Sequence, residues 1–249
     1  MSSCGVMNQA DIPSHSFHLP TVLLDRIPAV GDARKRVRTR YALLAATAAE
    51  LEQKGYEGLT IDGIVERAGM ARGTFYIYFD NRSDAAAAVR RSFTALMRQR
   101  RPRSGGNLTP SQAIYRMNRY YIACYARNAR IIAGHEALLR ERPDLARSRD
   151  YGNHRWARII LRDLCKRRGL SASLMDEPNA ILAARAVIAM ADELLRETFA
   201  FQSGYIKRYA HSEDALAQVM TFVWHRAIYG TDPAGIPPCI PAVSLRDLS

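Results

Sequence analysis

Residues 60–79 read TIDGIVERAGMARGTFYIYF, and their spacing is that of a helix, a three-residue turn and a short second helix. Thr60 is placed to cap a first helix that runs to Ala68, because a threonine hydroxyl accepts a hydrogen bond from the backbone of the first turn. Gly69 supplies the left-handed residue that ends this helix, since glycine adopts a positive φ without steric cost. We expect the second helix to begin near Ala71. The pattern predicts a helix-turn-helix.

The second helix combines a polar face with an apolar one. Its early turns carry Arg72, Thr74 and Tyr76, whereas Phe75 and Phe79 are spaced four residues apart and can dock together on the core. A short helix whose N-terminal end bears small and hydrogen-bonding side chains fits the major groove of DNA. The segment therefore predicts a DNA-reading element.

Residues 69–82, which read GMARGTFYIYFDNR, resemble the TetR family of bacterial transcriptional regulators. Upstream, the patterns Arg40-x-x-Leu-Leu44 and Gly55-Tyr-x-x-Leu-Thr60 fall at the spacing that this family has for its first helix and the turn into its second. The similarity covers roughly residues 36–98, about a quarter of the chain. Beyond this range the chain agrees with the family only in being long and helical.

Several positions depart from the common pattern of the family. Ala71 stands where a serine is frequent, so a side-chain cap or phosphate contact is missing there. Tyr78 replaces the usual histidine and Arg82 the usual lysine, and both substitutes still donate hydrogen bonds to phosphate. In the following helix, alanines at 85–88 replace the usual leucines. We expect thinner or differently filled packing beneath that helix.

The resemblance implies a homodimer that binds double-stranded operator DNA, with one reading helix from each subunit in successive major grooves about 34 to 36 Å apart. Arg72 and Thr74 would read base edges, and Gly73 would let the backbone approach the duplex. Residues around them would hold phosphates. The DNA-binding residues so predicted are Arg40, Thr60, Ala71, Arg72, Gly73, Thr74, Tyr76, Tyr78 and Arg82.

The charge of the chain suits a polyanionic partner. Its 36 Lys and Arg side chains exceed its 24 Asp and Glu side chains, which gives a formal net charge of +12. Residues 34–103 alone hold 15 basic and 7 acidic side chains, or two thirds of that surplus. Basic charge concentrated around a reading motif favours DNA, with an affinity that falls steeply with salt. The alternative is an arginine-rich composition without functional meaning.

Cysteine spacing and apolar runs bear on cofactors and compartment. Cys4, Cys124, Cys165 and Cys239 are widely separated and form no CxxC pair, so neither a zinc site nor a disulfide framework is indicated. No cofactor or metal is expected. No apolar run reaches the roughly 18 residues of a membrane span, and the N-terminus lacks the pattern of a signal peptide. We expect a cytoplasmic protein without a membrane partner.

We expect an all-α protein in four parts. Residues 1–33 form a largely disordered arm, and the basic residues from Arg34 onward contact phosphates or the minor groove, with a solvated charge run as the alternative. Residues 34–101 form a three-helix helix-turn-helix DNA-binding domain with a linking fourth helix. Residues 102–230 form a helical effector-binding and dimerisation domain. Residues 231–249 form an irregular tail.

Five helices are expected beyond the turn-rich break at residues 102–108. Their bounds follow from capping residues, prolines in the first turn and glycines or prolines near the end. The predicted ranges are 109–128, 129–142, 144–169, 176–203 and 212–230.

The last two of these helices form the predicted dimer interface. Residues 186–191 are apolar all round, which a helix exposed on one side would not tolerate. The final helix carries an apolar stripe through Leu216, Val219, Met220 and Val223. In the family that the chain resembles, two such helices from each subunit meet in a four-helix interface. A fully internal helix of a monomer is the alternative.

The helices before this interface carry candidate effector-binding residues. Aromatic side chains, methionine and a few polar groups together suit an apolar or aromatic small molecule, although ordinary core packing explains each of them as well. Glu193 lies in the most apolar helix and needs either an arginine partner or a polar cavity. The ligand-binding residues so predicted are Met117, Tyr120, Tyr121, Cys124, His135, Trp156, Ile160, Met190 and Glu193.

The sequence thus predicts a ligand-responsive transcriptional regulator, most often a repressor in this family, that a small apolar or aromatic effector releases from its operator. An architectural DNA-binding protein without an effector is the alternative. An all-α enzyme would use His135, Glu136, His154 or Glu193 as an acid or base, but no nucleophile with its base and no metal-ligand spacing supports one.

Overall fold

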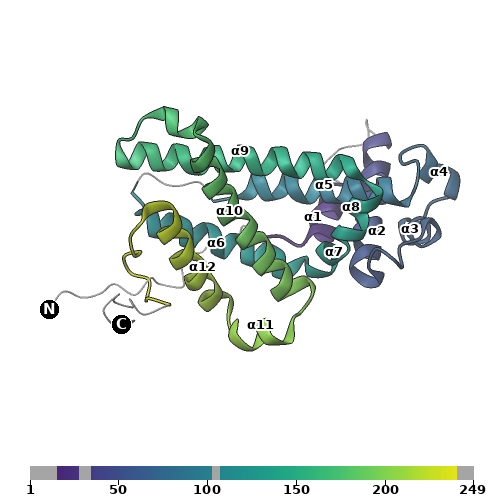
Figure 1. Ribbon diagram of the computed structural model, residues 1–249. Coiled ribbons are helices and arrows are strands. Elements are labelled where there is room, and N and C mark those ends of the chain that lie inside the picture. The colour runs from purple at the N-terminus through teal and green to yellow at the C-terminus, as the bar shows by residue number, and fades with distance from the viewer. Residues whose placement is uncertain (1–15, 28–34, 103–106, 240–249) are drawn as a thin grey trace.

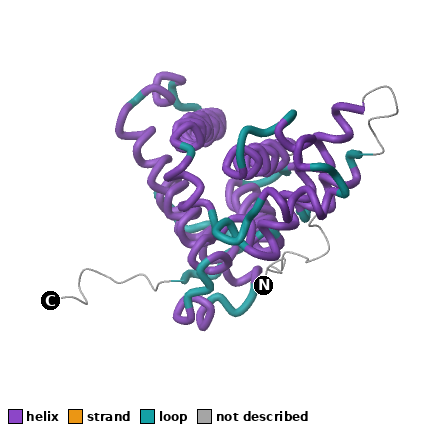
Figure 2. The backbone as a smooth tube through the Cα atoms, turned by 90° about the vertical axis from the view of Figure 1, so that its right-hand side faces the viewer, coloured by secondary structure: helices purple, strands orange, loops and turns teal. Residues whose placement is uncertain are grey.

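The computed structural model describes residues 16–27, 35–102 and 107–239, and its fold is all-α, as predicted (Figure 1). Within these ranges the backbone forms helices and loops but no strand (Figure 2). None of the helices described has both the length and the apolarity that crossing a bilayer requires.

The helices fall into a head and a core joined by α5. The head, residues 35–81, contains α2 (Lys35–Lys54), α3 (Ile61–Ala68) and α4 (Arg72–Tyr76), and it is preceded by α1 (Leu19–Asp25) and followed by α5 (Arg82–Arg100). The core, residues 107–239, contains α6 (Pro110–Arg127), α7 (Ala129–Ala133), α8 (His135–Glu141), α9 (Pro143–Arg168), η4 (Ala172–Asp176), α10 (Pro178–Leu195), η5 (Arg196–Ala200), α11 (Gly204–Tyr209) and α12 (Glu213–Tyr229).

The two helices of the predicted motif begin and end where local chemistry requires it. The Thr60 hydroxyl accepts a hydrogen bond from the Gly63 N–H at 3.1 Å and caps α3. Gly69 ends α3 with a φ of 63°, a conformation that an L side chain disfavours. The predicted helix-turn-helix is confirmed.

Apolar side chains from each helix hold the head together. Leu43 and Leu44 of α2, Ile64 of α3 and Phe75 of α4 are almost completely buried. Burying a side chain of this size contributes about 1.5 to 3 kcal/mol. Phe75 and Phe79 pack with their ring centroids 5.6 Å apart, as their spacing predicted. The short helix α4 is therefore anchored by its inner face.

Helix α5 leaves the head and runs along the core. The Asn81 side chain caps it by accepting a hydrogen bond from the Asp84 N–H at 2.9 Å. Alanines 85–88 are all buried, and so are alanines 45, 46 and 48 of α2, the helix that α5 contacts. The sequence predicted thinner or differently filled packing beneath α5. In the structure, α5 and α2 contact each other, and each buries several alanines.

Two of the predicted helix ranges in the core are interrupted, and the short segments η4 and α11 form between predicted ranges. The range 129–142 forms two helices divided at Gly134, where a Cβ would lie 2.6 Å from the Cβ of Tyr56 in the head. Glycine is required for this close approach. The range 176–203 ends as an α-helix at Leu195 and continues as the π segment η5.

The N-terminal segment corrects the expectation of a disordered arm. Residues 16–27 contain α1, which packs against α2, and Phe17, Leu19 and Leu23 are buried. The prediction was wrong because this segment is too short to show a helical repeat of apolar residues. Its helix is stabilised by contacts with residues that are distant in sequence. The rest of the predicted arm lies outside the described residues.

A buried asparagine of the core fixes this segment. The Asn128 Oδ1 atom accepts a hydrogen bond from the Leu19 N–H at 2.8 Å, and its Nδ2 atom donates to the Phe17 carbonyl at 2.8 Å. The Phe17 ring also lies 5.6 Å from the Phe93 ring of α5. The segment therefore joins α2, α5 and α6.

After α12 the described chain is irregular through residue 239. The Ser111 hydroxyl donates a hydrogen bond to the Ala234 carbonyl at 3.0 Å, which holds this stretch against α6. Residues 240–249 of the predicted tail lie outside the described residues.

Candidate nucleic-acid interface

Helix α4 divides its side chains between the interior of the head and the outside. Phe75 has no exposed surface, whereas Tyr76 is 49% exposed and Ile77, directly after the helix, is 63% exposed. Arg72 and Gly73 are exposed as well. In Figure 1, α4 lies at the opposite end of the molecule from α12. The outer face of α4 is open to a partner.

The first residues of α4 are suited to a close approach from outside. Ala71 is the N-cap but makes no side-chain cap hydrogen bond. A Cβ added at Gly73 would meet no atom within 4 Å, so the fold itself does not require glycine there. The absence of a side chain at Gly73 therefore makes room only for a molecule that approaches α4 from outside.

Arg72 is held between the two helices of the motif. Its Nη1 atom donates to the carboxylate oxygens of Asp62 on α3 at 2.8 and 3.0 Å. A hydrogen bond with Tyr76 and the charge of Asp62 raise the pKa of Arg72, which stays charged. Because both side chains of the ion pair are more than half exposed, water and competing acceptors reach it freely. The pair can exchange for another acceptor.

Arg82 makes contacts inside the head that its predicted phosphate role did not include. Its Nη1 atom donates to the carbonyls of Glu57 at 3.3 Å and Leu59 at 3.1 Å, and its guanidinium lies 5.1 Å from the centre of the Tyr56 ring. These acceptors belong to the turn between α2 and α3. Arg82 therefore joins that turn to α5, and a phosphate can use only its remaining N–H groups.

The other residues predicted to contact DNA surround α4 and the start of α2. Thr60 and Tyr76 are exposed, and Thr74 and Tyr78 are half-buried. Arg40 is exposed on α2, and its guanidinium lies 5.8 Å from the centre of the Phe79 ring. Hydroxyl and guanidinium donors are thus gathered at one end of the molecule.

The prediction missed a buried carboxylate that supports the motif. Glu50 of α2 is 2% exposed and forms ion pairs with Lys54 at 2.8 Å and Arg67 at 2.7 Å. Burial raises the pKa of Glu50, but the hydrogen bonds and charges of Lys54 and Arg67 outweigh it, and the pKa lies below its usual value. A Cβ at Gly63 would lie 2.6 Å from the Glu50 Oε2 atom. The only feature of the sequence that could have predicted this buried carboxylate was a lone glutamate, Glu50, next to an alanine-rich run.

Comparison with known proteins agrees with this geometry. Residues 43–89 match the family model described as bacterial regulatory proteins, tetR family. The chain carries the N-terminal domain of the TetR family. The match takes in α3, α4 and about half of α2, and it ends within α5.

One curated relative is similar to this chain over a short stretch. It is an uncharacterized HTH-type transcriptional regulator in the lacX 3' region of Lactococcus lactis subsp. lactis, 37% identical over 51 residues. The aligned stretch is 20% of this chain and 26% of that protein, so the chain spans about a quarter of the length of the curated relative it matches. The family-model match covers most of the head and the start of α5.

The residues predicted to bind an effector are dispersed in the core. Tyr120 and Cys124 are buried in the main apolar cluster, against which Met117 and Tyr121 pack. The Tyr120 hydroxyl donates to the Met97 carbonyl at 3.0 Å. These side chains belong to a packed interior, as in the core-packing alternative, and Tyr120 joins α6 to α5.

A second apolar cluster lies between α9 and α10. Trp156 and Ile160 pack against its buried residues, and the guanidinium of Arg101 lies 4.9 Å from the centre of the Trp156 ring. Met190 is half-buried on α10. The structure thus divides the predicted aromatic residues between two packed regions.

A groove of about 1010 Å³ lies between α8, α9 and α10, and we call it the core groove. Of the predicted ligand residues, His135 and Glu193 line it. Glu193 forms an ion pair with Arg196, which confirms the arginine partner considered for it. The core groove also receives Arg90 from α5 and Tyr125 from α6.

Helix α10 is not covered on all sides within one chain, which disagrees with the alternative of a fully internal helix of a monomer. Leu182 is 67% exposed, and Ala183 and Ala186 are exposed too. On α12, Met220 is 1% exposed and belongs to the interior of its own chain, whereas Val219 is 41% exposed. The predicted interface stripe is therefore divided between an inner and an outer face.

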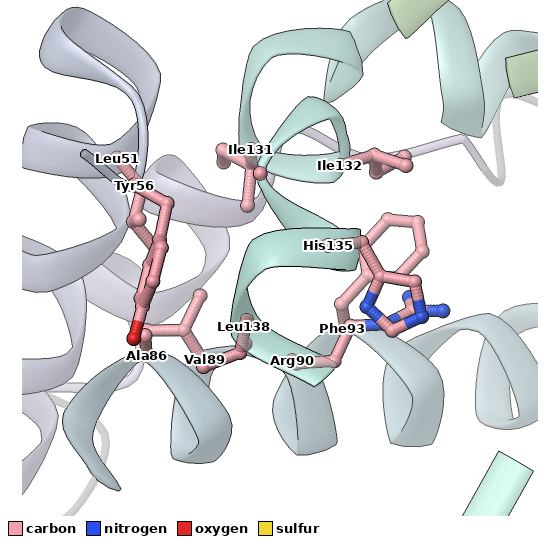
Figure 3. A pocket seen from close by; sticks show the side chains of 11 residues that line it. Leu51, Tyr56, Ala86, Val89, Arg90, Phe93, Ile131, Ile132, His135 and Leu138 are labelled. Atoms are coloured by element: carbon pink, nitrogen blue, oxygen red, sulfur yellow. The ribbon is translucent and has the colours of Figure 1, made fainter. Parts of the chain in front are cut away.

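A small cavity of about 20 Å³ lies where the head meets the core (Figure 3). It holds about one water molecule at most. Tyr56 comes from the head, and Arg90, Ile132 and His135 approach it from α5, α7 and α8. These last three residues also line the core groove. The groove and the head are thus connected by shared side chains.

Proposed function

We propose that this chain is a DNA-binding transcriptional regulator whose reading helix is α4. The observation that carries the proposal is the outward face of Arg72, Gly73, Tyr76 and Ile77 on a helix whose inner face is buried. DNA-binding helix-turn-helix domains place the N-terminal residues of such a helix against base edges in the major groove.

In this proposal Arg72 and Thr74 contact base edges, while Thr60 and Tyr76 donate hydrogen bonds to phosphates. Arg72 exchanges the carboxylate of Asp62 for the acceptor atoms of a guanine, the acceptors that a guanidinium fork matches best. Because the ion pair is exposed, breaking it costs little free energy. The net positive charge of the chain draws it toward DNA.

We infer further that the regulator acts as a homodimer through α10 and α12. These helices contact each other and leave Ala183, Ala186 and Val219 exposed. A two-fold dimer doubles the contact with DNA and matches a symmetric operator. Val219→Glu should give a folded monomer with weak operator binding, as checked by light scattering. Met220→Glu should unfold the chain instead, because it places a charge in the interior.

An effector in the core completes the proposal, with repression as the resting state. Arg90, Ile132 and His135 line both the core groove and the cavity beside the head, so an occupant of the groove acts on α5. A coupling free energy of about 1 to 3 kcal/mol would change operator affinity roughly 5- to 150-fold.

The test begins with selection of bound fragments from a library of random duplexes. We expect recovery of one two-fold symmetric site, bound at least about 10³-fold more tightly than random DNA at physiological salt. Fluorescence anisotropy measures both affinities. An isotherm that depends on salt but not on sequence would instead favour the architectural alternative.

A further inference from the structure

The core groove has apolar walls around a charged centre. Ile132, Leu139 and Ile181 contribute apolar surface from three different helices, and Ala189 extends the wall along α10. A volume of about 1010 Å³ is at the upper end of the range for small-molecule sites. The walls suit a ligand with an apolar body.

Most charges at the rim of the core groove are already paired. Arg196 forms ion pairs with Glu136 and Glu193, and Arg185 forms one with Asp150 at 2.7 Å. These two arginines and three carboxylates sum to one excess negative charge. They leave little net charge at the rim for a ligand.

Two further arginines that line the core groove differ from Arg185 and Arg196. In the part of the chain that the structure describes, Arg90 of α5 and Arg149 of α9 have no carboxylate at ion-pair distance. Arg90 lies with its guanidinium 5.4 Å from the centre of the Phe93 ring, beside His135 (Figure 3). Arg90 is half-buried, and a guanidinium withdrawn from water in this way is stabilised by an anion, whereas Arg149 is exposed and adds its positive charge to the same groove.

His135 is an unsatisfied polar side chain at this centre. It is 7% exposed, and neither of its ring nitrogens has a hydrogen-bond partner in the described structure. Burial, together with the charges of Arg90, Arg149 and Arg196, lowers the pKa of His135 to about 3, so the ring is neutral at pH 7. A neutral imidazole offers one donor and one acceptor. Such a group needs a partner from outside the chain.

One carboxyl group limits the charge of the ligand. Burial raises the pKa of Asp192, and the Tyr125 hydroxyl donates to its Oδ1 atom at 3.3 Å. Arg90 and Arg149 lower the pKa of the same carboxyl. A doubly charged phosphate would add strong repulsion from Asp192, whereas a single negative charge is balanced by the two arginines.

We propose that the core groove binds an organic carboxylate with an apolar body. The carboxylate lies between Arg90 and Arg149, His135 hydrogen-bonds to it or to a neighbouring polar atom, and the body covers Ile132, Leu139 and Ile181. The identity of this ligand as the effector rests on the proposed function, but its binding does not. Because Arg90 belongs to α5, an occupied groove positions the helix that leads into the head.

The test uses the full chain without DNA and two pairs of probes, decanoate with decanamide and 2-naphthoate with 2-naphthamide. Isothermal titration should show at least one acid binding at least tenfold more tightly than its neutral amide. Arg149→Ala and Arg149→Gln should each remove this preference. Arg162→Ala, an exposed arginine of α9 outside the groove lining, should leave it unchanged. Thermal unfolding of each variant without probe confirms that it is folded.

The outcomes separate the site from the regulatory function. Equal affinity for acid and amide, absence of binding by both acids, or an acid preference that survives both Arg149 variants would overturn the site. A chain that binds an acid but selects no DNA sequence retains the site and loses the proposed function. A chain that selects an operator but binds neither acid retains the function and loses the site.

Discussion

The head and the core groove use arginine in opposite ways. In the head, Arg67 pairs with the buried Glu50, and Arg82 donates to backbone carbonyls of a turn. In the groove, Arg90 and Arg149 meet no carboxylate at ion-pair distance among the residues described. Both of these arginines of the head have acceptors within their own chain. Among the groove residues proposed to contact the ligand, His135 has no partner for either ring nitrogen in the described structure.

The difference teaches which arginines bind a partner and which hold the fold. A guanidinium that donates to fixed carbonyls loses those bonds if it turns toward a ligand, so its removal acts on stability. A guanidinium without a partner has no such bonds, so its removal acts on binding. Arg72 lies between these cases, because its only carboxylate partner in the described head is exposed. Mutating each class separates the two effects.

Arg82→Ala should have the largest effect on stability. We expect the free energy of unfolding to fall by about 2 to 3 kcal/mol, because carbonyls of the turn between α2 and α3 lose a charged donor. Urea denaturation measures this change. Arg82→Lys, which keeps the charge and loses the fork, should recover only part of it. An unchanged midpoint for Arg82→Ala would show that its hydrogen bonds contribute nothing to the head.

Arg72→Ala should act on DNA and hardly on stability. We expect operator affinity to fall by about 1 to 3 kcal/mol and preference to weaken at particular base pairs, with unfolding changed by less than about 0.5 kcal/mol. Anisotropy titrations on operator and random duplexes measure this. Arg162→Ala removes the same charge far from α4 and serves as the control. Equal losses on operator and random DNA would contradict base reading by Arg72.

His135 should make the chain less stable as the pH falls. Its pKa is about 3 in the folded chain and about 6.5 in the unfolded chain, so below pH 6.5 the unfolded state takes up a proton that the folded state does not. Stability should fall by about 1 kcal/mol between pH 6.5 and 5.5. His135→Leu should lack this component, and the difference between the two denaturation curves isolates it from the titration of Asp192. Parallel pH profiles would refute a buried neutral imidazole.

Arg149→Ala should have the smallest effect on the unliganded chain. We expect the free energy of unfolding to change by less than about 0.5 kcal/mol, because no ion pair is broken among the described residues. Arg185→Ala, which removes the partner of Asp150, is the matched comparison in the same groove. A large loss of stability in Arg149→Ala alone would mean that this arginine holds the fold, and the contrast with the head would disappear.

Much of the head could be predicted from the sequence because its signals are local. The cap at Thr60, the left-handed Gly69 and the four-residue spacing of Phe75 and Phe79 act within a few residues of each other. The role of Arg82 was not predictable in the same way. Its acceptors lie 23 to 26 residues away, and a family pattern of basic residues does not reveal them.

The core was harder to predict because its signals are distant in sequence. Gly134 divides a helix where the core touches Tyr56, 78 positions earlier in the chain. Aromatic and methionine stripes indicated a ligand site, but the same side chains fill interiors, and most of them do so here. The core groove takes its polar centre from several helices, and only His135 of that centre was among the predicted residues. Such a centre is visible only once the helices are assembled.

The N-terminal helix α1 has a practical consequence for anyone who recombines regulators. A hybrid made by cutting this chain between α5 and α6 would separate the Asn128 amide from Phe17 and Leu19, and would leave buried backbone and amide groups without acceptors or donors. Exchange of the head alone therefore has to preserve residues 16–27 with the core, as a module made of two pieces of chain that are not contiguous. A cut between α5 and α6, which the order of the domains suggests, would therefore break these contacts.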